Sequence, residues 1–350
     1  MSRYDDEYIF RLATVNDIED IMAFYDAYWP GNKIMGKDRR YVEWQFGLKD
    51  SDAICVLLAL SKLDGDIIGA KGFVSGSPVL EGADIWGCSI LINSNRALPM
   101  LGMELDRRAR TIIPYRTHLT LGMRSNTLAL AQTVFGKKTG RLAHYYRINP
   151  NIDEYRLALV NNTNSSCKCI SRGNAARIRL YDNADWMEQS YGGGDPDAIP
   201  FKSKWYIRHH YYEHPIYHYD VYGIERNSVC DALFVTRTIE HKGASALRVV
   251  DYIGDRSVLS SVGTGWCDIL TASGAEYMDF YAYGFDDSVL SKIGFSRRTD
   301  EDTNIIPNWY EPFVRENKDI AYGLETDDDV ILCKADGDMD KPNWGYYPEV

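Results

Sequence analysis

One order of secondary structure is predicted twice along the chain, and this repetition is the strongest constraint on its fold. In both halves, strand patterns lead to a longer helix, another strand and a short helix that ends at a glycine, Gly136 in the first and Gly294 in the second. These glycines lie 294 − 136 = 158 residues apart, about one domain length. We therefore expect two copies of one mixed α/β unit. A single large α/β domain with similar pieces recurring by chance is the alternative.

The first unit is predicted from apolar periodicity and turn signals. Ile18, Ile21 and Tyr25 follow a helical stripe that begins at Thr14, a hydroxyl N-cap. The remaining elements are strands at 10–12, 54–60, 67–74, 84–92, 119–123 and 141–147, and helices at 98–112 and 126–135.

The second unit repeats the later part of this order. Its predicted elements are strands at 232–237, 247–253 and 277–283, and helices at 258–270 and 286–293. Polar, glycine-rich sequence at 161–166 and 191–196 separates the halves and is typical of linkers and loops. We expect the first domain over residues 1–160 and the second over 161–350.

Composition limits the classes of protein that the chain can belong to. With 45% hydrophobic and 25% charged residues, it has the composition of a folded protein, and its net charge of −11 argues against a nucleic-acid partner. No uncharged stretch approaches the ~18–20 residues that span a membrane, and the N-terminus lacks an apolar segment. We expect a cytoplasmic protein with no membrane partner, whose seven scattered cysteines are mostly buried, reduced thiols.

Several strings in the sequence resemble known families. The opening at 10–18, Ile68-Gly-Ala-Lys-Gly-Phe, and Ser125-Asn126 before the short helix resemble the GCN5-related N-acetyltransferases. A closer resemblance, to the two-domain sugar N-acyltransferases of bacterial surface-glycan pathways such as anthrose biosynthesis, covers nearly the whole chain. The strings that carry it are Asp84-Ile-Trp, Leu142-Ala-His-Tyr-Tyr, His214-Pro-Ile-Tyr, Ile305-Ile-Pro-Asn-Trp-Tyr-Glu-Pro-Phe and Lys334-Ala-Asp-Gly-Asp-Met-Asp-Lys-Pro-Asn.

This resemblance implies an α/β fold of two tandem acetyltransferase-like domains, each a mixed, mostly antiparallel sheet flanked by helices. It also implies a reaction in which an acyl-CoA acylates the amino group of a dTDP-linked amino-dideoxysugar, for example dTDP-4-amino-4,6-dideoxyglucose. Coenzyme A would bind the first domain. The residues expected to hold it are Leu91, Ile92 and Asn93 of the strand, Leu101 and Gly102 at the start of the long helix, and Asn126.

Two departures from the acetyltransferase pattern concern the donor site. The phosphate loop of that family has two glycines, whereas the segment here has only Gly102 and carries Pro99, which lacks a backbone donor. The family's short helix often supplies a tyrosine that protonates the leaving thiolate, and Gln132 occupies that position. We therefore expect less ideal phosphate contacts, or contacts partly from the second domain, and no side-chain acid at Gln132.

Three residues are candidates for the chemistry. Asp84 opens an otherwise uncharged strand and is the first candidate for accepting the amine proton, although an acid there is also typical of a solvated strand end. Ser75 lies on the neighbouring strand and can donate a hydrogen bond to the acceptor, or simply form the turn at Gly76. Glu311, flanked by aromatic residues and a proline, can close the site from the second domain or form an interdomain ion pair.

The acceptor is expected in a cleft between the domains, with further contacts from Trp86, His214, Trp309 and Asp336. The histidines near His214 do not predict a metal site, because Pro215 interrupts any helix that would align them, and the tyrosines around them suggest an aromatic platform or interface packing. Asp336 opens an acidic loop that lacks the glycine and the glutamate of a calcium loop. It can contact sugar hydroxyls or remain solvated. We expect no metal.

Two other functions compete with this one. Tandem acetyltransferase folds also occur in peptide ligases that use aminoacyl-tRNA, which the acidic charge disfavours. A non-catalytic binding module that has lost CoA is the third possibility. The identity of the acyl chain, the sugar and the oligomeric state are not predicted by the sequence.

Overall fold

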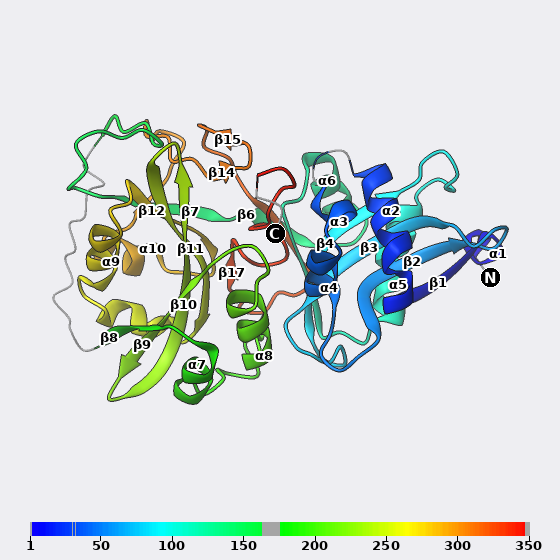
Figure 1. Cartoon of the computed structure of the whole chain (residues 1–350), viewed down its shortest axis with the longest axis horizontal. Coiled ribbons are helices and arrows are strands. Elements are labelled where there is room, and N and C mark those ends of the chain that lie inside the picture. The colour runs from blue at the N-terminus through cyan, green and yellow to red at the C-terminus, as the bar shows by residue number, and fades with distance from the viewer. Residues whose placement is uncertain (1, 30, 32, 163–175, 347–350) are drawn as a thin grey trace.

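Two sheets form the framework of the computed structural model, which describes residues 2–29, 31, 33–162 and 176–346 (Figure 1). The first sheet has the strand order β1-β2-β3-β4-β5-β16-β6, and the second has the order β13-β7-β12-β11-β10-β9-β8, with β17 beside β12. Pairing is antiparallel except between β4 and β5 and between β11 and β12. The expected fold class, two mixed and mostly antiparallel sheets flanked by helices, is confirmed.

The first sheet and its helices occupy the right side of Figure 1. Its strands are β1 (Tyr8–Thr14), β2 (Ala53–Ser61), β3 (Ile67–Ser75), β4 (Asp84–Ile92), β5 (Thr117–Leu121), β6 (Lys138–Arg141) and β16 (Ala321–Leu324). Its helices are α1 (Arg3–Glu7), α2 (Ile18–Tyr28), α3 (Ile34–Lys37), α4 (Arg39–Phe46), α5 (Leu101–Ile112) and α6 (Ser125–Thr133), with a 3₁₀ turn η1 (Val15–Asp17).

The second sheet lies on the left of Figure 1. Its strands are β7 (Ala143–Ile148), β8 (Arg177–Tyr181), β9 (Asp220–Arg226), β10 (Val229–His241), β11 (Ala244–Gly254), β12 (Tyr277–Tyr283), β13 (Ser296–Arg297) and β17 (Leu332–Cys333). Around it lie α7 (Ala184–Ser190), α8 (Lys204–Ile207), the π-helical turn η3 (Arg208–Tyr212), the 3₁₀ turn η4 (Arg256–Ser261), α9 (Gly265–Ser273), α10 (Asp287–Lys292) and the hairpin β14 (Trp309–Tyr310) with β15 (Phe313–Val314).

The repeated order appears as a repeated topology. In the first unit, β3 and β4 pair and α5 leads to β5, which pairs with β4 in parallel. In the second, β10 and β11 pair and α9 leads to β12, which pairs with β11 in parallel. The helix expected at 258–270 is divided, because a turn around Gly263 separates η4 from α9.

The two units exchange strands across the boundary expected near residue 160. The strand β7 follows β6 directly in the chain but pairs with β12 of the second sheet. In return, β16 lies between β5 and β6 of the first sheet and pairs with both. Neither sheet is therefore completed by one half of the chain alone.

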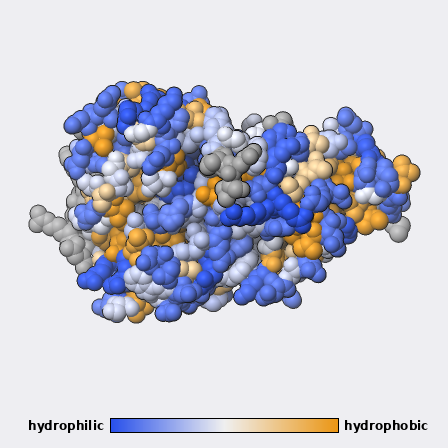
Figure 2. All heavy atoms as spheres, viewed as in Figure 1, coloured by the Kyte–Doolittle hydropathy of each residue, from blue (hydrophilic) through white to orange (hydrophobic). Residues whose placement is uncertain are grey.

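A shared core also joins the units. Trp86 of β4 is fully buried and stacks on Tyr206 of α8 with ring centroids 5.4 Å apart. The same cluster contains Leu119 of β5 and Leu233 of β10. Hydrophilic residues cover much of the face shown in Figure 2, with smaller hydrophobic groups between them. Among the described residues, no helix is both long and apolar enough to cross a membrane.

Candidate functional site

A cavity of about 960 Å³ opens where β4 and β5 separate and continues to the second unit. The parallel pairing begins with Asp84 opposite Thr117 and ends with Gly87 opposite Thr120. Beyond Gly87, β4 therefore has its backbone on one wall of the cavity, and the end of β5 lies on the other. The separation of two parallel strands is what makes the sheet accessible at this point.

A β-bulge in β4 lies at the same place. The register with β3 pairs Phe73 with Gly87 and Gly72 with Ser89, so that Cys88 is skipped. A bulge residue lies outside the regular ladder of backbone hydrogen bonds. Because Gly87, Cys88 and Ser89 all line the cavity, the bulge offers backbone polar groups to a bound molecule.

The long helix α5 forms another wall. Met100, immediately before the helix, has φ +67°, a left-handed conformation that non-glycine residues rarely adopt. Gly102, in the first turn, lines the cavity, and a Cβ added to it would meet Ile90 at 3.4 Å. The single glycine of this segment therefore lies where the helix comes close to β4. Met100 takes the strained position, at which a glycine would be favoured.

Five ionisable side chains form a buried cluster beside this wall. Nζ of Lys71 donates to Oδ1 of Asp106 at 2.7 Å, and Nζ of Lys137 lies 3.0 Å from Oε1 of Glu325. Between these pairs, Nδ1 of His118 lies 3.2 Å from Glu325. Burial and then the positive charge of Lys71 lower the pKa of His118 to about 4. Burial alone would raise the pKa of Asp106, but the charges of Lys71, His118 and Lys137 outweigh it and hold that pKa below its usual value.

Asp106, His118 and Glu325 bring ligand-type atoms within 4.8 Å of one another. The two lysine ammonium groups contact the same carboxylates and balance their charge. A divalent cation there would be repelled by both lysines. We therefore interpret the cluster as an ion-pair network and assign no metal to it.

The strand β14, the turn after it and the segment that follows β17 provide the opposite wall. Glu311, between the hairpin strands, accepts hydrogen bonds from the Tyr217 hydroxyl at 2.7 Å and from the Asn343 backbone at 2.8 Å. Its burial raises the pKa of its carboxyl group, although the Tyr217 bond acts in the opposite direction. Nearby, 39% of Trp309 is exposed, and its ring faces the Lys334 ammonium at 5.8 Å.

Two buried polar side chains, Asn308 and Lys334, lie next to each other on this wall. Oδ1 of Asn308 is buried and has no donor among the described residues. Nζ of Lys334 donates to the backbone carbonyl of Asn308 at 2.9 Å. Burial, followed by the charge of Arg248, lowers the pKa of Lys334 to about 7. Buried polar atoms almost always have partners, so the free acceptor of Asn308 indicates a bound donor, either water or ligand.

The carboxylate of Asp84 is held by other parts of the chain, away from the large cavity. Its carboxylate accepts bonds from Nε and Nη2 of Arg116 at 2.9 and 2.5 Å, from Oγ1 of Thr117 at 2.7 Å and from the Phe201 backbone at 2.7 Å. Asp84 lies at the start of β4, where β5 is still paired, and is not among the residues that line the large cavity. Four hydrogen bonds from three residues hold both oxygens and join β4 to a segment of the second unit. This arrangement is structural.

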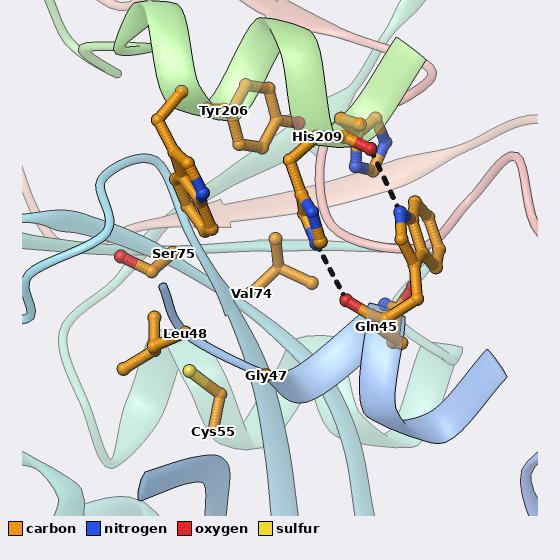
Figure 3. Close-up of a pocket in the computed structure, with 11 residues that line it drawn as sticks. Gln45, Gly47, Leu48, Cys55, Val74, Ser75, Tyr206 and His209 are labelled. Carbon is orange, nitrogen blue, oxygen red and sulfur yellow. Dashed lines mark hydrogen bonds between the residues drawn. The ribbon is translucent and has the colours of Figure 1, made fainter. Parts of the chain in front are cut away.

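Ser75 also lies away from the large cavity. Its hydroxyl donates to the carbonyl of Ser77 at 2.8 Å, so the turn interpretation describes its place correctly. Figure 3 shows it beside a smaller cavity of about 10 Å³, with Tyr206 and His209 on the helical segment across from it. A reciprocal pair of bonds between His209 and Trp44 closes that space. It has room for about one water molecule and not for a sugar.

Three of the expected acceptor contacts lie away from the large cavity. Trp86 is fully buried in the shared core. His214 is half-buried, and its Nδ1 accepts from the backbone of Ile216 and Tyr217. Asp336 is fully buried and lies 2.7 Å from Nζ of Lys202. None of the three lines the large cavity, because each is held by other parts of the chain. Trp309 is the one of the four that lines it.

Of the residues expected to hold CoA, some line the cavity and others do not. Leu91 and Gly102 line the cavity. Ile92, Asn93 and Leu101 do not: Ile92 and Leu101 pack in or against the first core, and Asn93 is buried at the end of β4. Asn126 lies in α6, and its side chain is outside the described part of the structure.

Sequence reasoning missed most of the charged residues around the cavity. Lys71 interrupts the apolar pattern of β3, whereas Asp106 stands among the other charged residues of α5 and has no such signal. Asn308 and Lys334 stand inside strings that carried the family resemblance. A charged residue in an otherwise buried strand was the signal available for Lys71.

Comparisons with known proteins identify the fold. No family model and no curated protein matches the chain. A solved GCN5-related N-acetyltransferase from Anabaena variabilis is similar over 90% of this chain and 72% of its own, with 9% identity and a TM-score of 0.50. The Saccharomyces cerevisiae N-myristoyltransferase, solved with bound myristoyl-CoA, is similar over 91% and 78%, with 9% identity and a TM-score of 0.45. The first likeness and the element order show that the chain has the GCN5-related N-acetyltransferase fold in tandem.

Proposed function

We propose that the protein is an acyl-CoA-dependent N-acyltransferase whose acceptor is a nucleotide-linked amino sugar. The observation that carries the proposal is the cavity at the separation of β4 and β5, with the bulge at Cys88 on its wall. The Anabaena variabilis protein named above, whose fold is similar, is a GCN5-related N-acetyltransferase. The sugar acceptor comes from the sequence resemblance and from the chemistry of the second wall.

The first unit has the features that an acyl-CoA needs. The backbone of β4 from Gly87 to Leu91 can pair with the amide groups of the pantetheine arm, since that edge is free of β5. The start of α5 near Gly102 provides backbone N–H groups and a helix dipole for phosphates. Asn126, on the facing helix α6, is a further donor-site residue in this proposal. The donor would lie between α5 and α6.

The second wall has the features that a hydroxylated amine needs. Trp309 offers an apolar ring against which the C–H face of a sugar can pack. The unpaired Oδ1 of Asn308 accepts from a hydroxyl or amino group, and the Lys334 side chain offers donors beside it. A sugar hydroxyl both donates and accepts, which satisfies the two groups together. A dTDP-linked amino-dideoxysugar fits these requirements.

The reaction requires a neutral amine, a stabilised oxyanion and a leaving thiolate. Glu311 takes the proton from the acceptor ammonium, and its raised pKa suits this role because it brings the carboxylate nearer the working pH. The amine nitrogen attacks the thioester carbonyl, and backbone N–H groups at the bulge stabilise the oxyanion by about 2.7–4 kcal/mol per donor. The thiolate leaves without a dedicated acid, because thiols have a pKa near ~8.5. We place this reaction in the cytoplasm.

Calorimetry and a substrate screen test the proposal. Acetyl-CoA is titrated into the protein, and dTDP-3-amino and dTDP-4-amino sugars are then screened as acceptors by following free thiol release. Binding of the donor and thiol release that depends on the amino sugar are expected. Absence of donor binding up to millimolar concentration would leave a non-catalytic module, and salt-dependent binding of tRNA would favour a peptide ligase.

A further inference from the structure

Charged groups form part of one end of the donor cavity. Lys71, Asp106 and Lys137 line it directly, although only 2, 6 and 5% of each residue is exposed. His118, which is fully buried, lies behind them and connects Lys71 to Glu325. Ionised side chains are rarely this deeply buried, and here each is held by a partner of opposite charge.

This charge cluster lies against the point where β4 and β5 separate. Gly87 is in the last parallel pair, and a Cβ added to it would meet Nε2 of His118 at 2.8 Å and Nζ of Lys71 at 3.5 Å. The cluster therefore packs directly against the backbone of Gly87, with no room for a side chain at that position. A group held at Gly87 or Cys88 is in contact with ion-paired side chains.

We propose that Lys71, Asp106, His118 and Lys137 form the floor of the donor acyl pocket and restrict the donor to short acyl groups. The inference rests on the proposed function, because it places the thioester at the bulge. An alkyl chain gains about fourfold in affinity per methylene only where it leaves water for an apolar surface. Against this floor, a chain would instead displace water from ammonium and carboxylate groups that need polar contacts.

The charge balance of the floor supports the same conclusion. Two ammonium groups face two carboxylates, and His118 is neutral because burial keeps its pKa low. The cluster therefore has no excess charge that a charged acyl end would neutralise. Its charged groups are already paired with one another. The floor therefore disfavours a long alkyl chain and does not call for a charged acyl group in its place.

Unreactive CoA thioethers test the inference without an acceptor or catalysis. S-ethyl-CoA and S-octyl-CoA are titrated calorimetrically into the wild-type protein. We expect S-octyl-CoA to bind at least tenfold more weakly than S-ethyl-CoA. Tighter binding of S-octyl-CoA, rising with each methylene, would overturn the inference while leaving the proposed function intact. If neither thioether nor free CoA binds, the proposed function fails as well.

A charge-matched double variant tests the floor directly. Lys71→Met with Asp106→Leu removes one ion pair and leaves the pair of Lys137 and Glu325. Replacing a buried pair by apolar residues of similar size often leaves stability unchanged or raises it. We expect the affinity for S-octyl-CoA relative to S-ethyl-CoA to rise at least tenfold, and an unchanged ratio would overturn the inference.

The matched control removes an ion pair outside the cavity, by Arg226→Met with Asp231→Leu in the β9–β10 hairpin. It should keep the wild-type ratio, and an equal change in this control would also overturn the inference. If the Lys71 and Asp106 variant does not fold, the wild-type thioether series decides the question.

Discussion

Replacing Asp84 by asparagine separates a structural carboxylate from a catalytic one. In the structure, Oδ2 of Asp84 accepts from Nη2 of Arg116 and from the Phe201 backbone, while Oδ1 accepts from Nε of Arg116 and from Thr117. All four bonds therefore have Asp84 as the acceptor. In Asp84→Asn, one of the two positions becomes an NH₂ group, which faces two donors and can accept from neither. Arg116 also loses its counter-charge.

The size of the effect follows from these contacts. A hydrogen bond to a charged group contributes about 1.5–3 kcal/mol, and breaking a buried ion pair removes about 3–5 kcal/mol. Water can replace part of this, because 32% of the Arg116 side chain is exposed while none of the Asp84 side chain is. We therefore expect a destabilisation of about 3 kcal/mol. At about 2–4 °C per kcal/mol, the unfolding midpoint should fall by roughly 6–12 °C.

The assay compares stability with turnover. Thermal unfolding is followed by circular dichroism, and thiol release is measured well below the midpoint with saturating substrates. Turnover of Asp84→Asn should stay within about threefold of wild type, since the residue does not line the cavity. The contrasting variant is Glu311→Gln, which should lose turnover with little change in midpoint. A hundredfold loss of turnover in Asp84→Asn at an unchanged midpoint would refute the structural assignment.

Four further outcomes are expected. Glu311→Gln should lower turnover about 10²-fold and abolish the acidic limb of the pH–rate profile, which the raised pKa of Glu311 produces. If the limb is retained, another group accepts the proton of the acceptor ammonium. His118 has a folded pKa of about 4 against 6.5 when unfolded, so the unfolded chain binds the extra proton and stability should fall as pH drops from 6.5 to about 4. Denaturation of His118→Gln should show a smaller fall, and an equal one would contradict the shift. In Gly87→Ala, the new Cβ would lie 2.8 Å from His118, so calorimetry should show at least about tenfold weaker CoA binding; unchanged affinity would move the donor elsewhere. Trp309→Ala should raise the acceptor KM about tenfold and leave the donor KM unchanged, and equal changes in both would exclude an acceptor platform.

The fold was largely predictable because its signals are local. The hairpin of β2 and β3 follows from two apolar runs around Asp64-Gly65, and the helix α2 follows from a stripe with a capping box at its start. Each of these depends on residues within one element. The repeated order of elements then predicted the two sheets without any long-range contact being known.

The site was less predictable because its residues meet only through tertiary structure. Glu311 and Trp309 line the cavity as expected, since a proline and aromatic residues marked an unusual acid. Asp84 carried a similar signal, an acid two residues before a tryptophan, but its partner Arg116 lies 32 residues away, just before β5. Nothing local distinguishes a carboxylate that meets a substrate from one that meets an arginine.

The exchanged strand explains why the charge cluster needs the whole chain. Within the first half, Lys71 and Lys137 face a single carboxylate, Asp106, and a neutral His118. The second carboxylate is Glu325, which directly follows β16 and reaches the cluster because β16 is inserted between β5 and β6. Without that strand, one ammonium group would be buried with no counter-charge, which is strongly unfavourable. The strand from the second half therefore completes both the sheet and the charge balance beside the donor cavity.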